Sequence, residues 1–532
     1  MSKLNHYIIL LIFSLLILVP GITNVPVIDR DEAHFAQATK QMIQNDNYFQ
    51  IRFQEITRFQ KPPGINWLQA ASLKLFSQVD AHEIWPYRLP SLLGALFSIV
   101  LTYFFARRFF DPKTAFFGAG LLATTLLLVF ESHMAVIDSM LLFSVVLMQG
   151  SLWIVYEKED CHWGWALCFW LSLAFGLVLK GVTPLVAVLT LFTLCVVDRN
   201  IQFIKRLHPV KGLILFSALT LIWVLGVNAA EHSNYLMQMI HKDLLPKLQG
   251  GHESHGKPPL FHLAILPLTF WPASLFLWQV AVYGFLKRKQ KNIRFLLAWI
   301  LPTWIFFELM PTKLPQYVLP TFPALAVLMA LSFEQMKVKP AHWVHVLQIL
   351  WILLTLGIGV AIASVPYLLM QQITWDSMML IAVITVMSIW SVLYAWQGKS
   401  HKAATVLFVM SVLVYPLVFG RILPQLKPLW LTSNLVKKLD MKQVSEEKPI
   451  LVIDFGEPSL AFNLNTKLVA FTSYKNAEHQ LKSDPSRIIV VPESFFKAMP
   501  ESEQLKYRIQ SETRGFNYSK GKWVTLLVIT AT

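Results

Sequence analysis

The sequence predicts a polytopic α-helical membrane protein with about thirteen transmembrane helices, followed by a small C-terminal α/β domain. Of its 532 residues, 55% are hydrophobic and only 14% are charged, which excludes an ordinary soluble protein. Apolar stretches long enough to cross a hydrocarbon core of about 30 Å recur from the N-terminus to about Gly420, and the composition changes after about Leu426. Because lipid cannot satisfy free backbone groups, the spanning segments must be helices.

The expected spans follow one another along the first four-fifths of the chain. The first starts after a single Lys3, and the residues after Pro20 offer no clear small-x-small cleavage site, so we expect an uncleaved first helix. The spans are expected at 6–27, 86–106, 114–131, 135–155, 163–179, 182–198, 211–229, 260–286, 294–310, 315–333, 343–368, 375–396 and 403–422.

Basic residues are spread through short loops between the apolar runs, although the formal net charge is +15. They form no single stripe, so we expect no nucleic acid partner and interpret them as the positive-inside bias of membrane proteins. This bias places the basic loops on the cytoplasmic side, and an odd number of spans then places the C-terminus on the external side. The loops on that side carry Arg107-Arg108, Lys205-Arg206 with Lys211, Lys287-Arg288-Lys289, Lys337 with Lys339, and Lys399 with Lys402.

Two long segments, 28–85 and 230–259, fall on the external side in this topology. We expect a membrane domain over 1–425 and a small soluble α/β domain over 426–532, because short β-type runs alternate there with polar, helix-compatible stretches. The β-type runs, all too short to be spans, are Ile450 to Ile453, Leu468 to Phe471, Ile488 to Val491 and Val524 to Ile529.

Ionisable residues collect on the external side, beginning in the first long loop. Asp31 and Glu32 open this loop directly after a span, where a carboxylate can act as a base or hold a polar substrate. The alternative is that Asp31 is the N-cap of a helix. Later in the loop, Lys61 lies in a rigid, proline-rich turn that suits anion recognition, with contact to lipid phosphates as the alternative.

Further candidates lie at the ends of predicted spans on the same side. Asp138 starts one span and Lys180 ends another, and ionisable groups at membrane depth are functional candidates by default. For Lys180 the alternative is a long side chain reaching to the interface. Lys313 and Tyr317 are four residues apart, so on a helix they would share one face and form a phosphate clamp, or else a pair of interfacial anchors.

The second long loop ends in a cluster of imidazoles, a carboxylate and a lysine, namely His252, Glu253, His255 and Lys257. His252 and His255 could share a divalent cation with Glu253, although histidines in a glycine-flanked loop are often bystanders. The three cysteines include no CxxC pair and suggest neither a disulfide framework nor a zinc site. No cofactor is therefore expected as a requirement, and a divalent metal is left open.

In this order, these pieces resemble the lipid-linked glycosyltransferases that include bacterial aminoarabinose transferases acting on lipid A and the protein O-mannosyltransferases. The resemblance covers most of the membrane part, and its last motif is the most specific. The matching residues are Asp31-Glu32, Lys61-Pro62-Pro63, Asp138, Leu179-Lys180-Gly181, His255 with Lys257-Pro258, and Lys313-Leu314-Pro315-Gln316-Tyr317-Val318-Leu319-Pro320.

The resemblance implies a membrane fold of the GT-C type in the bacterial inner membrane, with a cavity open to the periplasm and a small periplasmic C-terminal domain. It implies transfer from a polyprenyl (undecaprenyl) phosphate sugar to lipid A, another glycan or a protein, with membrane lipids around the enzyme. By this resemblance, Asp31 and Asp138 would face sugar and acceptor, with Glu32 beside them, and the donor phosphate would be held by Lys61, Lys180, Lys257, Lys313 and Tyr317.

The chemistry of such a transfer fits these residue types. The leaving polyprenyl phosphate is already a stable anion, so the enzyme needs cations more than a proton donor, and Asp31 would serve as base only for a hydroxyl acceptor. Aminoarabinose transferases usually carry an Arg two residues after the Asp-Glu pair and a Glu before the loop lysine, whereas this chain has His34 and Gln60. We therefore predict a different sugar, a hexosamine or a neutral hexose.

Other functions use similar parts: a transporter or flippase of lipid-linked sugars, a polymerase or ligase of polyprenyl-linked glycans, and a protein O-glycosyltransferase. Transporters often show paired halves with interrupted helices at the midplane. This sequence has no internal repeat, and its candidate residues lie at one face. The sequence therefore favours an enzyme.

Overall fold

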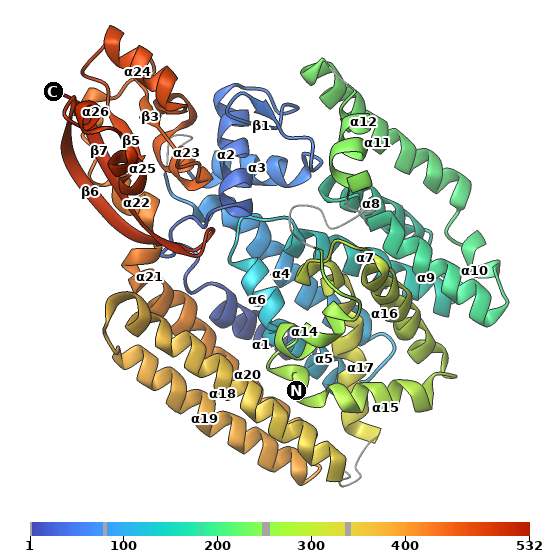
Figure 1. The fold of residues 1–532 in the computed structure, drawn as a ribbon. Coiled ribbons are helices and arrows are strands. Elements are labelled where there is room, and N and C mark those ends of the chain that lie inside the picture. The colour runs from blue at the N-terminus through green and yellow to red at the C-terminus, as the bar shows by residue number, and fades with distance from the viewer. Residues whose placement is uncertain (1–2, 78–81, 182, 233, 247–255, 336–341) are drawn as a thin grey trace.

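Helices make up most of the chain up to Gln425 in the computed structural model, which describes residues 3–77, 82–181, 183–232, 234–246, 256–335 and 342–532 (Figure 1). A hairpin of β1 (Arg52–Phe53) and β2 (Ile56–Thr57) lies in the first long loop. The α-helices of this part are α1 (Lys3–Leu18), α2 (Asp31–Gln44), α3 (Gly64–Phe76), α4 (Trp85–Ala106), α5 (Pro112–Thr124), α6 (Leu126–Ser132), α7 (Asp138–Glu157), α8 (Gly164–Leu179), α9 (Thr183–Asp198), α10 (Gln202–Lys205), α11 (Pro209–Glu231), α12 (Tyr235–Met239), α14 (Phe261–Thr269), α15 (Leu277–Lys287), α16 (Lys291–Leu309), α17 (Phe322–Gln335), α18 (His342–Met370), α19 (Trp375–Trp396), α20 (Ser400–Leu417) and α21 (Leu423–Gln425).

Tighter or wider helical turns interrupt this series at several points. The 3₁₀ segments are η3 (Ala273–Phe276), η4 (Pro315–Thr321) and η6 (Lys427–Leu429), and the π segments are η1 (Ile240–Leu244) and η5 (Val418–Ile422). Prolines lie in or next to several of them, where a missing N–H breaks the regular α-helical ladder.

The predicted multi-pass helical membrane fold is confirmed, with a difference in the number of spans. Among the described residues, 8 helices are long and apolar enough to cross a membrane, or up to 10 if each of two bent pairs is one span. These pairs are α5 with α6, bent by 62°, and α14 with the segment 273–287, bent by 115°. The other predicted spans, 6–27, 163–179 and 182–198, coincide with the shorter apolar helices α1, α8 and α9. The prediction of about thirteen spans therefore counted short helices and bent pairs as full spans.

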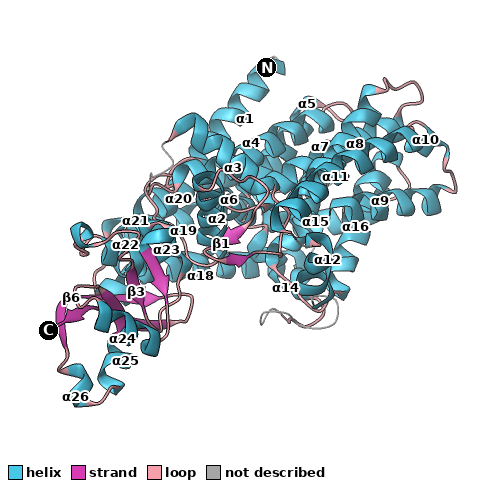
Figure 2. Cartoon of the chain, turned by 90° about the horizontal axis from the view of Figure 1, so that it is seen from above, coloured by secondary structure: helices cyan, strands magenta, loops and turns pink. Residues whose placement is uncertain are grey.

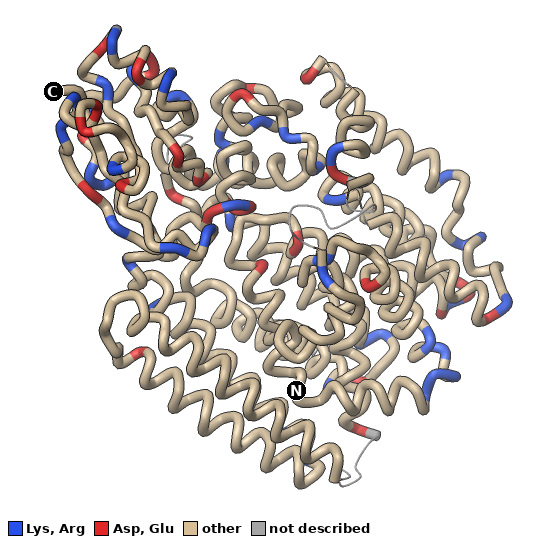
Figure 3. The backbone as a smooth tube through the Cα atoms, viewed as in Figure 1, with Lys and Arg blue, Asp and Glu red and all other residues tan. Residues whose placement is uncertain are grey.

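Burial separates central helices from outer ones. In α7 and in the run 315–334, 89% of the most apolar window is buried, against 17% in α11 and 28% in α18. The outer helices expose large apolar side chains such as Leu213 and Leu353. Figure 1 shows α18 and α19 side by side at the edge of the helical part, and Figure 3 shows few charges along them. These surfaces suit contact with lipid.

The predicted α/β character of the C-terminal region is confirmed, and Figure 2 shows its strands gathered to one side of the helices. Five strands form one mixed sheet in the order β4-β3-β5-β7-β6, with β3 parallel to β4 and β5, and β7 antiparallel to β5 and β6. The elements are α22 (Leu431–Val436), η7 (Met441–Gln443), β3 (Ile450–Val452), α23 (Pro458–Leu464), η8 (Thr466–Leu468), β4 (Val469–Phe471), α24 (Tyr474–Ser483), β5 (Ile489–Pro492), α25 (Glu493–Ala498), α26 (Glu501–Gln504), β6 (Tyr507–Asn517) and β7 (Lys522–Ala531).

The C-terminal region packs directly on α2. Phe462 of α23 is fully buried in a cluster with Ala33 and Ala36 of α2, and Lys40 Nζ of α2 donates a hydrogen bond to the Phe462 carbonyl at 3.2 Å. Gln37 of the same helix donates to the Thr466 hydroxyl. The helix that opens the first long loop is therefore held between α3 of the same loop and α23 of the C-terminal region.

Asp29 lies in this contact, and its surroundings predict that the contact depends on pH. The amide N–H of Ser459 donates to the Asp29 carboxylate at 2.9 Å, and the Tyr518 hydroxyl accepts from the Asp29 amide at 2.6 Å. Burial, assisted by the neighbouring Glu457 carboxylate and opposed by the hydrogen bonds from Ser459, raises the pKa of Asp29 to about 7. The folded protein then binds more protons than the unfolded chain between about pH 4 and pH 7.

Raising the pH through this window is expected to weaken the contact between α23 and α2. The carboxyl is favoured in its protonated form when buried, so its stabilising contribution is present at low pH and is lost as pH rises towards 7. Hydrogen exchange at the backbone of α23, corrected for intrinsic exchange rates, should be faster at pH 8 than at pH 5.5. The Asp29→Asn variant should show no such difference, and equal protection of the native protein at both values would contradict the assignment.

Candidate active site

Four segments far apart in sequence meet at one end of the central helices. The apolar base of this region joins Phe35 of α2, Ile65 of α3, Ile137 before α7 and Leu179 of α8 in one buried cluster. Beside this base, charges on the first residues of α2 and α7 and on the residue after α8 act on one glutamate of α6, and α6 and α7 both pack against η4. Of the predicted site residues, these segments carry Asp31, Asp138, Lys180 and Tyr317.

Asp138 and Lys180 form an ion pair in this region. The Lys180 Nζ lies 2.7 Å from Asp138 Oδ1, and the two side chains are 16% and 10% exposed. The same ammonium lies 5.3 Å from the centre of the Tyr317 ring. A partly buried pair of this kind presents one cation that is oriented by a carboxylate and an aromatic face.

Glu131 of α6 belongs to the same cluster, although the sequence analysis did not select it. The side chain is buried, and the charges of Asp138, Lys180 and Asp31 all act on it. These interactions connect Asp31 at the start of α2 with the Asp138–Lys180 pair. The signal that could have identified it is a single glutamate directly after the apolar run 126–130.

Asp31 is the first residue of α2 and is exposed. The alternative prediction that Asp31 caps this helix is wrong, because Arg30 occupies the N-cap position with a positive φ of 70° and makes no side-chain cap. The Asp31 carboxylate thus lies at the positive end of the helix dipole, where a negative charge is favoured, and remains accessible to a substrate.

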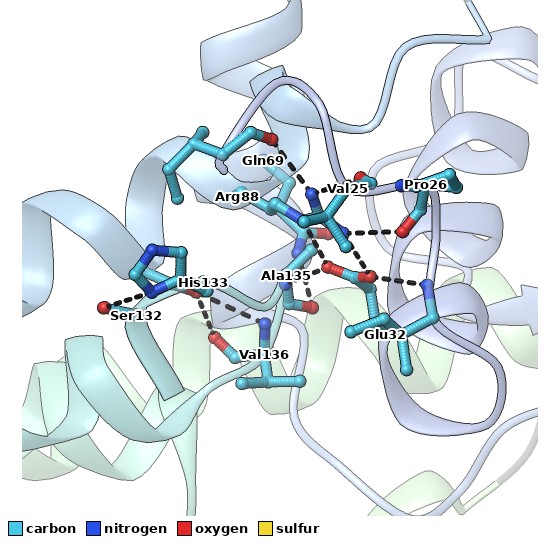
Figure 4. A network of polar contacts seen from close by, with 12 residues as sticks. Val25, Pro26, Glu32, Gln69, Arg88, Ser132, His133, Ala135 and Val136 are labelled. Atoms are coloured by element: carbon cyan, nitrogen blue, oxygen red, sulfur yellow. Dashed lines mark hydrogen bonds and ion pairs between the residues drawn. The ribbon is translucent and has the colours of Figure 1, made fainter. Parts of the chain in front are cut away.

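Glu32, by contrast, is fully buried and fully hydrogen-bonded (Figure 4). Its carboxylate accepts from Arg88 Nε and Nη2, both at 2.8 Å, from the Ile28 amide at 2.7 Å and from the Ala135 amide at 2.8 Å. No lone pair is left for a substrate, which argues against the direct catalytic role predicted for Glu32. This side chain instead ties the start of α2 to the turn before α7.

Arg88, which the sequence analysis missed, completes this network from α4. Besides Glu32, its guanidinium donates to the carbonyls of Ile22 at 2.9 Å, Val25 at 2.7 Å and Pro26 at 3.0 Å. The chain between α1 and α2 is therefore wrapped around one buried cation, and the position of Asp31 depends on it.

Lys61 lies near the end of α8 but is already paired. Its Nζ is 3.4 Å from Asp243 Oδ2 of η1, with 26% of the lysine side chain exposed. Three residues later, Gly64 begins α3 so close to α8 that a Cβ would lie 2.6 Å from the Val178 carbonyl oxygen. Glycine therefore allows the turn carrying Lys61 to approach the helix that ends at Lys180.

Lys313 and Lys257 form a second basic group beside Tyr317. The Lys313 ammonium donates to the carbonyls of Met310 at 2.6 Å and Lys257 at 3.1 Å, and the side chain is 3% exposed. The expectation that Lys313 and Tyr317 share a helix face is wrong, because Lys313 precedes η4 and η4 is a 3₁₀ helix. Lys313 organises the loop, while Lys257 is exposed.

Sequence relatives bear on this arrangement. Residues 60–224 match the family described as dolichyl-phosphate-mannose-protein mannosyltransferase. The undecaprenyl phosphate-alpha-4-amino-4-deoxy-L-arabinose arabinosyl transferase of Pseudomonas aeruginosa (strain LESB58) is 28% identical over 334 residues, which cover 62% of this chain and 59% of that protein. The chain therefore matches about three-fifths of the length of such curated relatives.

Solved structures extend the likeness to the whole chain. The structure resembles that of ArnT from Cupriavidus metallidurans in the apo state with a TM-score of 0.77 at 15% identity, over 99% of this chain and 98% of that chain. The chain has the ArnT fold. ArnT bound to undecaprenyl phosphate matches with a TM-score of 0.75, also at 15% identity, over 98% and 97% of the two chains. The predicted resemblance is thus confirmed in sequence and in fold.

Within this ArnT-like fold, the two departures from the expected motif lie in different surroundings. His34 of α2 packs edge-on against Phe53 at 4.9 Å, and burial together with the nearby Arg58 lowers its pKa to about 4. The imidazole is thus neutral near pH 7, while Arg58 supplies a positive charge beside it. Gln60 is exposed.

The predicted metal ligands cannot be placed in the ArnT-like fold. His252, Glu253 and His255 lie outside the described residues. Among the residues that are described, no group of three or more His, Cys, Asp or Glu side chains could hold a metal ion.

Proposed function

We propose that this protein is an inner-membrane glycosyltransferase that moves a sugar from a polyprenyl (undecaprenyl) phosphate to lipid A or another envelope acceptor. The observation that carries the proposal is the Lys180–Asp138 ion pair, whose ammonium lies against the Tyr317 ring. Both charges of this pair act on Glu131, and so does the charge of Asp31. Support comes from the undecaprenyl phosphate named in the ArnT complex and in the relatives.

In the proposed reaction, a nucleophilic oxygen of the acceptor attacks the sugar carbon that is bonded to the donor phosphate. The carbon–oxygen bond to the phosphate breaks, and the bonding electrons leave with the polyprenyl phosphate. Lys180, oriented by Asp138, and the basic residues Lys61 and Lys257 would balance the charge on that leaving group. Asp31 would take the proton of a hydroxyl acceptor, or contact the sugar if the acceptor is a phosphate.

We place the membrane domain at 1–425 and the soluble domain at 426–532, with the site and the C-terminal region on the periplasmic side. The clustering of basic loops at the opposite ends of the spans supports this orientation. A protein acceptor is the second candidate, because the matching family description names a protein mannosyltransferase. Mass spectrometry of lipid A and of envelope glycoproteins, with and without this protein, would separate the two acceptors.

Replacing Lys180 with methionine is expected to weaken the binding of undecaprenyl phosphate about tenfold or more, because a charge-assisted contact is worth roughly 1.5–3 kcal/mol. The loss should exceed that of Lys291→Met, which removes a lysine paired with Glu157 at 3.5 Å at the other end of α7. Binding to purified protein in nanodiscs can be measured by native mass spectrometry. Equal affinities of the two variants would argue that Lys180 is an interfacial anchor.

A further inference from the structure

Glu131 is a buried carboxylate of this site to which neither the resemblance nor the proposed reaction gives a role. It is the second-last residue of α6, and the residue is 6% exposed. Within the described part of the chain, its carboxylate takes part in no hydrogen bond and in no ion pair within 4 Å, and Lys180 acts on it only from farther away. Its oxygens are not among the fully enclosed side-chain atoms that lack a partner, so the carboxylate keeps some contact with its surroundings and can be reached by a ligand.

The surroundings of Glu131 contain more negative than positive charge. Asp138, Lys180 and Asp31 act on it electrostatically, and the single ammonium among them is already engaged by Asp138 at 2.7 Å. The helix α6 also packs against η4, which carries Tyr317. A ligand that brings hydrogen-bond donors or a positive charge would therefore suit this position.

Glu32 shows how the same fold treats a buried carboxylate that has only a structural role. There, two backbone amides and two guanidinium nitrogens occupy the oxygens. Glu131 lies only four residues before Ala135, whose amide binds Glu32, yet it receives no such partner. The contrast separates a carboxylate that holds the backbone from one that is left available.

We propose that Glu131 is a substrate-binding residue whose carboxylate accepts hydrogen bonds from the sugar of the polyprenyl-phosphate donor. This inference rests on the proposed function and specifies its substrate. The donor phosphate is repelled by a carboxylate, so the sugar is the part of the donor that can supply hydroxyl or ammonium donors. A sugar with a free ammonium fits best, because its charge balances the excess of carboxylates. A hexosamine with a free amine and aminoarabinose both meet this condition, whereas a neutral hexose does not.

The test compares three lipids bound to the purified full-length protein in nanodiscs, measured by native mass spectrometry. The lipids are undecaprenyl phosphate, undecaprenyl phosphate-4-amino-4-deoxy-L-arabinose, and the latter after N-acetylation of its amine. Wild-type protein should bind the amino-sugar lipid more tightly than the acetylated lipid. Glu131→Gln should weaken the amino-sugar lipid about tenfold to a hundredfold and leave undecaprenyl phosphate within about twofold.

The control variant is Glu157→Gln, which neutralises a carboxylate at the opposite end of α7, next to Lys291, and should bind all three lipids as the wild type does. Equal effects of Glu131→Gln on all three lipids, or no effect, would overturn the role of Glu131. Equal wild-type affinity for the amino and acetylated lipids would also overturn the role of Glu131, and this comparison needs no variant. If wild-type protein binds none of the three lipids, the proposed function itself fails, and this inference fails with it.

Discussion

Replacing Arg88 with methionine is expected to destabilise the protein by about 3–5 kcal/mol, because it leaves the Glu32 carboxylate buried without its cation. Five hydrogen bonds from one guanidinium are lost at once, two to Glu32 and three to the carbonyls of Ile22, Val25 and Pro26. Both partners of the ion pair are 0% exposed, so solvent cannot replace these contacts. Thermal unfolding in detergent, followed by tryptophan fluorescence, measures the effect.

A matched control is Lys113→Met, which breaks an exposed pair with Glu334 at 3.0 Å. An exposed pair contributes about 1 kcal/mol or less, so this variant should unfold close to the wild type. Adding Glu32→Gln to Arg88→Met should recover part of the loss, because the unpaired buried charge is removed. If Arg88→Met and Lys113→Met unfold at the same temperature, the network is not the structural support described above.

Asparagine in place of Asp31 is expected to lower sugar transfer about 10²- to 10⁴-fold, as for loss of a general base or of a contact made in the transition state. The residue is exposed at the first turn of α2, so folding and the binding of undecaprenyl phosphate should both persist. Transfer is measured as the mass of one sugar gained by the acceptor over time.

Asp46→Asn provides the control for Asp31→Asn, since Asp46 is an exposed carboxylate beyond the C-terminal end of the same helix. It should transfer sugar at the wild-type rate. Full activity of Asp31→Asn would remove Asp31 from the mechanism, whereas loss of both activity and lipid binding would indicate a role in folding.

The membrane helices could be predicted from the sequence because their signal is local. A run of apolar residues is sufficient to mark α4, α7 or α18, and no distant contact is needed. The four apolar β-type runs correspond to β3, β4, β5 and β7 for the same reason. Strand β6 (Tyr507–Asn517) was missed, because it is an edge strand in which most side chains are polar and no apolar run marks it.

The candidate site was only partly predictable, because its contacts join distant segments. Asp138 and Lys180 were both selected by their depth in the membrane, but their pairing across 42 residues needs the packing of α7 on α8. Glu32 was selected with Asp31 as a neighbour in sequence, yet successive residues of a helix point in different directions, and only Glu32 turns inward to Arg88. Nothing in the local sequence around Arg88 indicates that partner.

The four-residue spacing of Lys313 and Tyr317 was misleading for a related reason. Spacing indicates a shared face only if the segment is an α-helix, and Pro315 instead starts a 3₁₀ helix after Lys313. The lysine is then drawn to the carbonyls of Met310 and Lys257, which a local pattern cannot show.

The most direct measurement of the central claim is a reconstituted transfer reaction. Purified protein in nanodiscs is given polyprenyl-phosphate sugars extracted from the membranes of its own host, together with lipid A, and the products are identified by mass spectrometry. The proposed function predicts that free polyprenyl phosphate appears in step with lipid A that is heavier by one sugar, and that Asp31→Asn slows the appearance of both about 10²- to 10⁴-fold. If the sugar-linked lipid reacts with neither lipid A nor any other envelope acceptor and only crosses the bilayer intact, the protein is a transporter and the proposal is wrong.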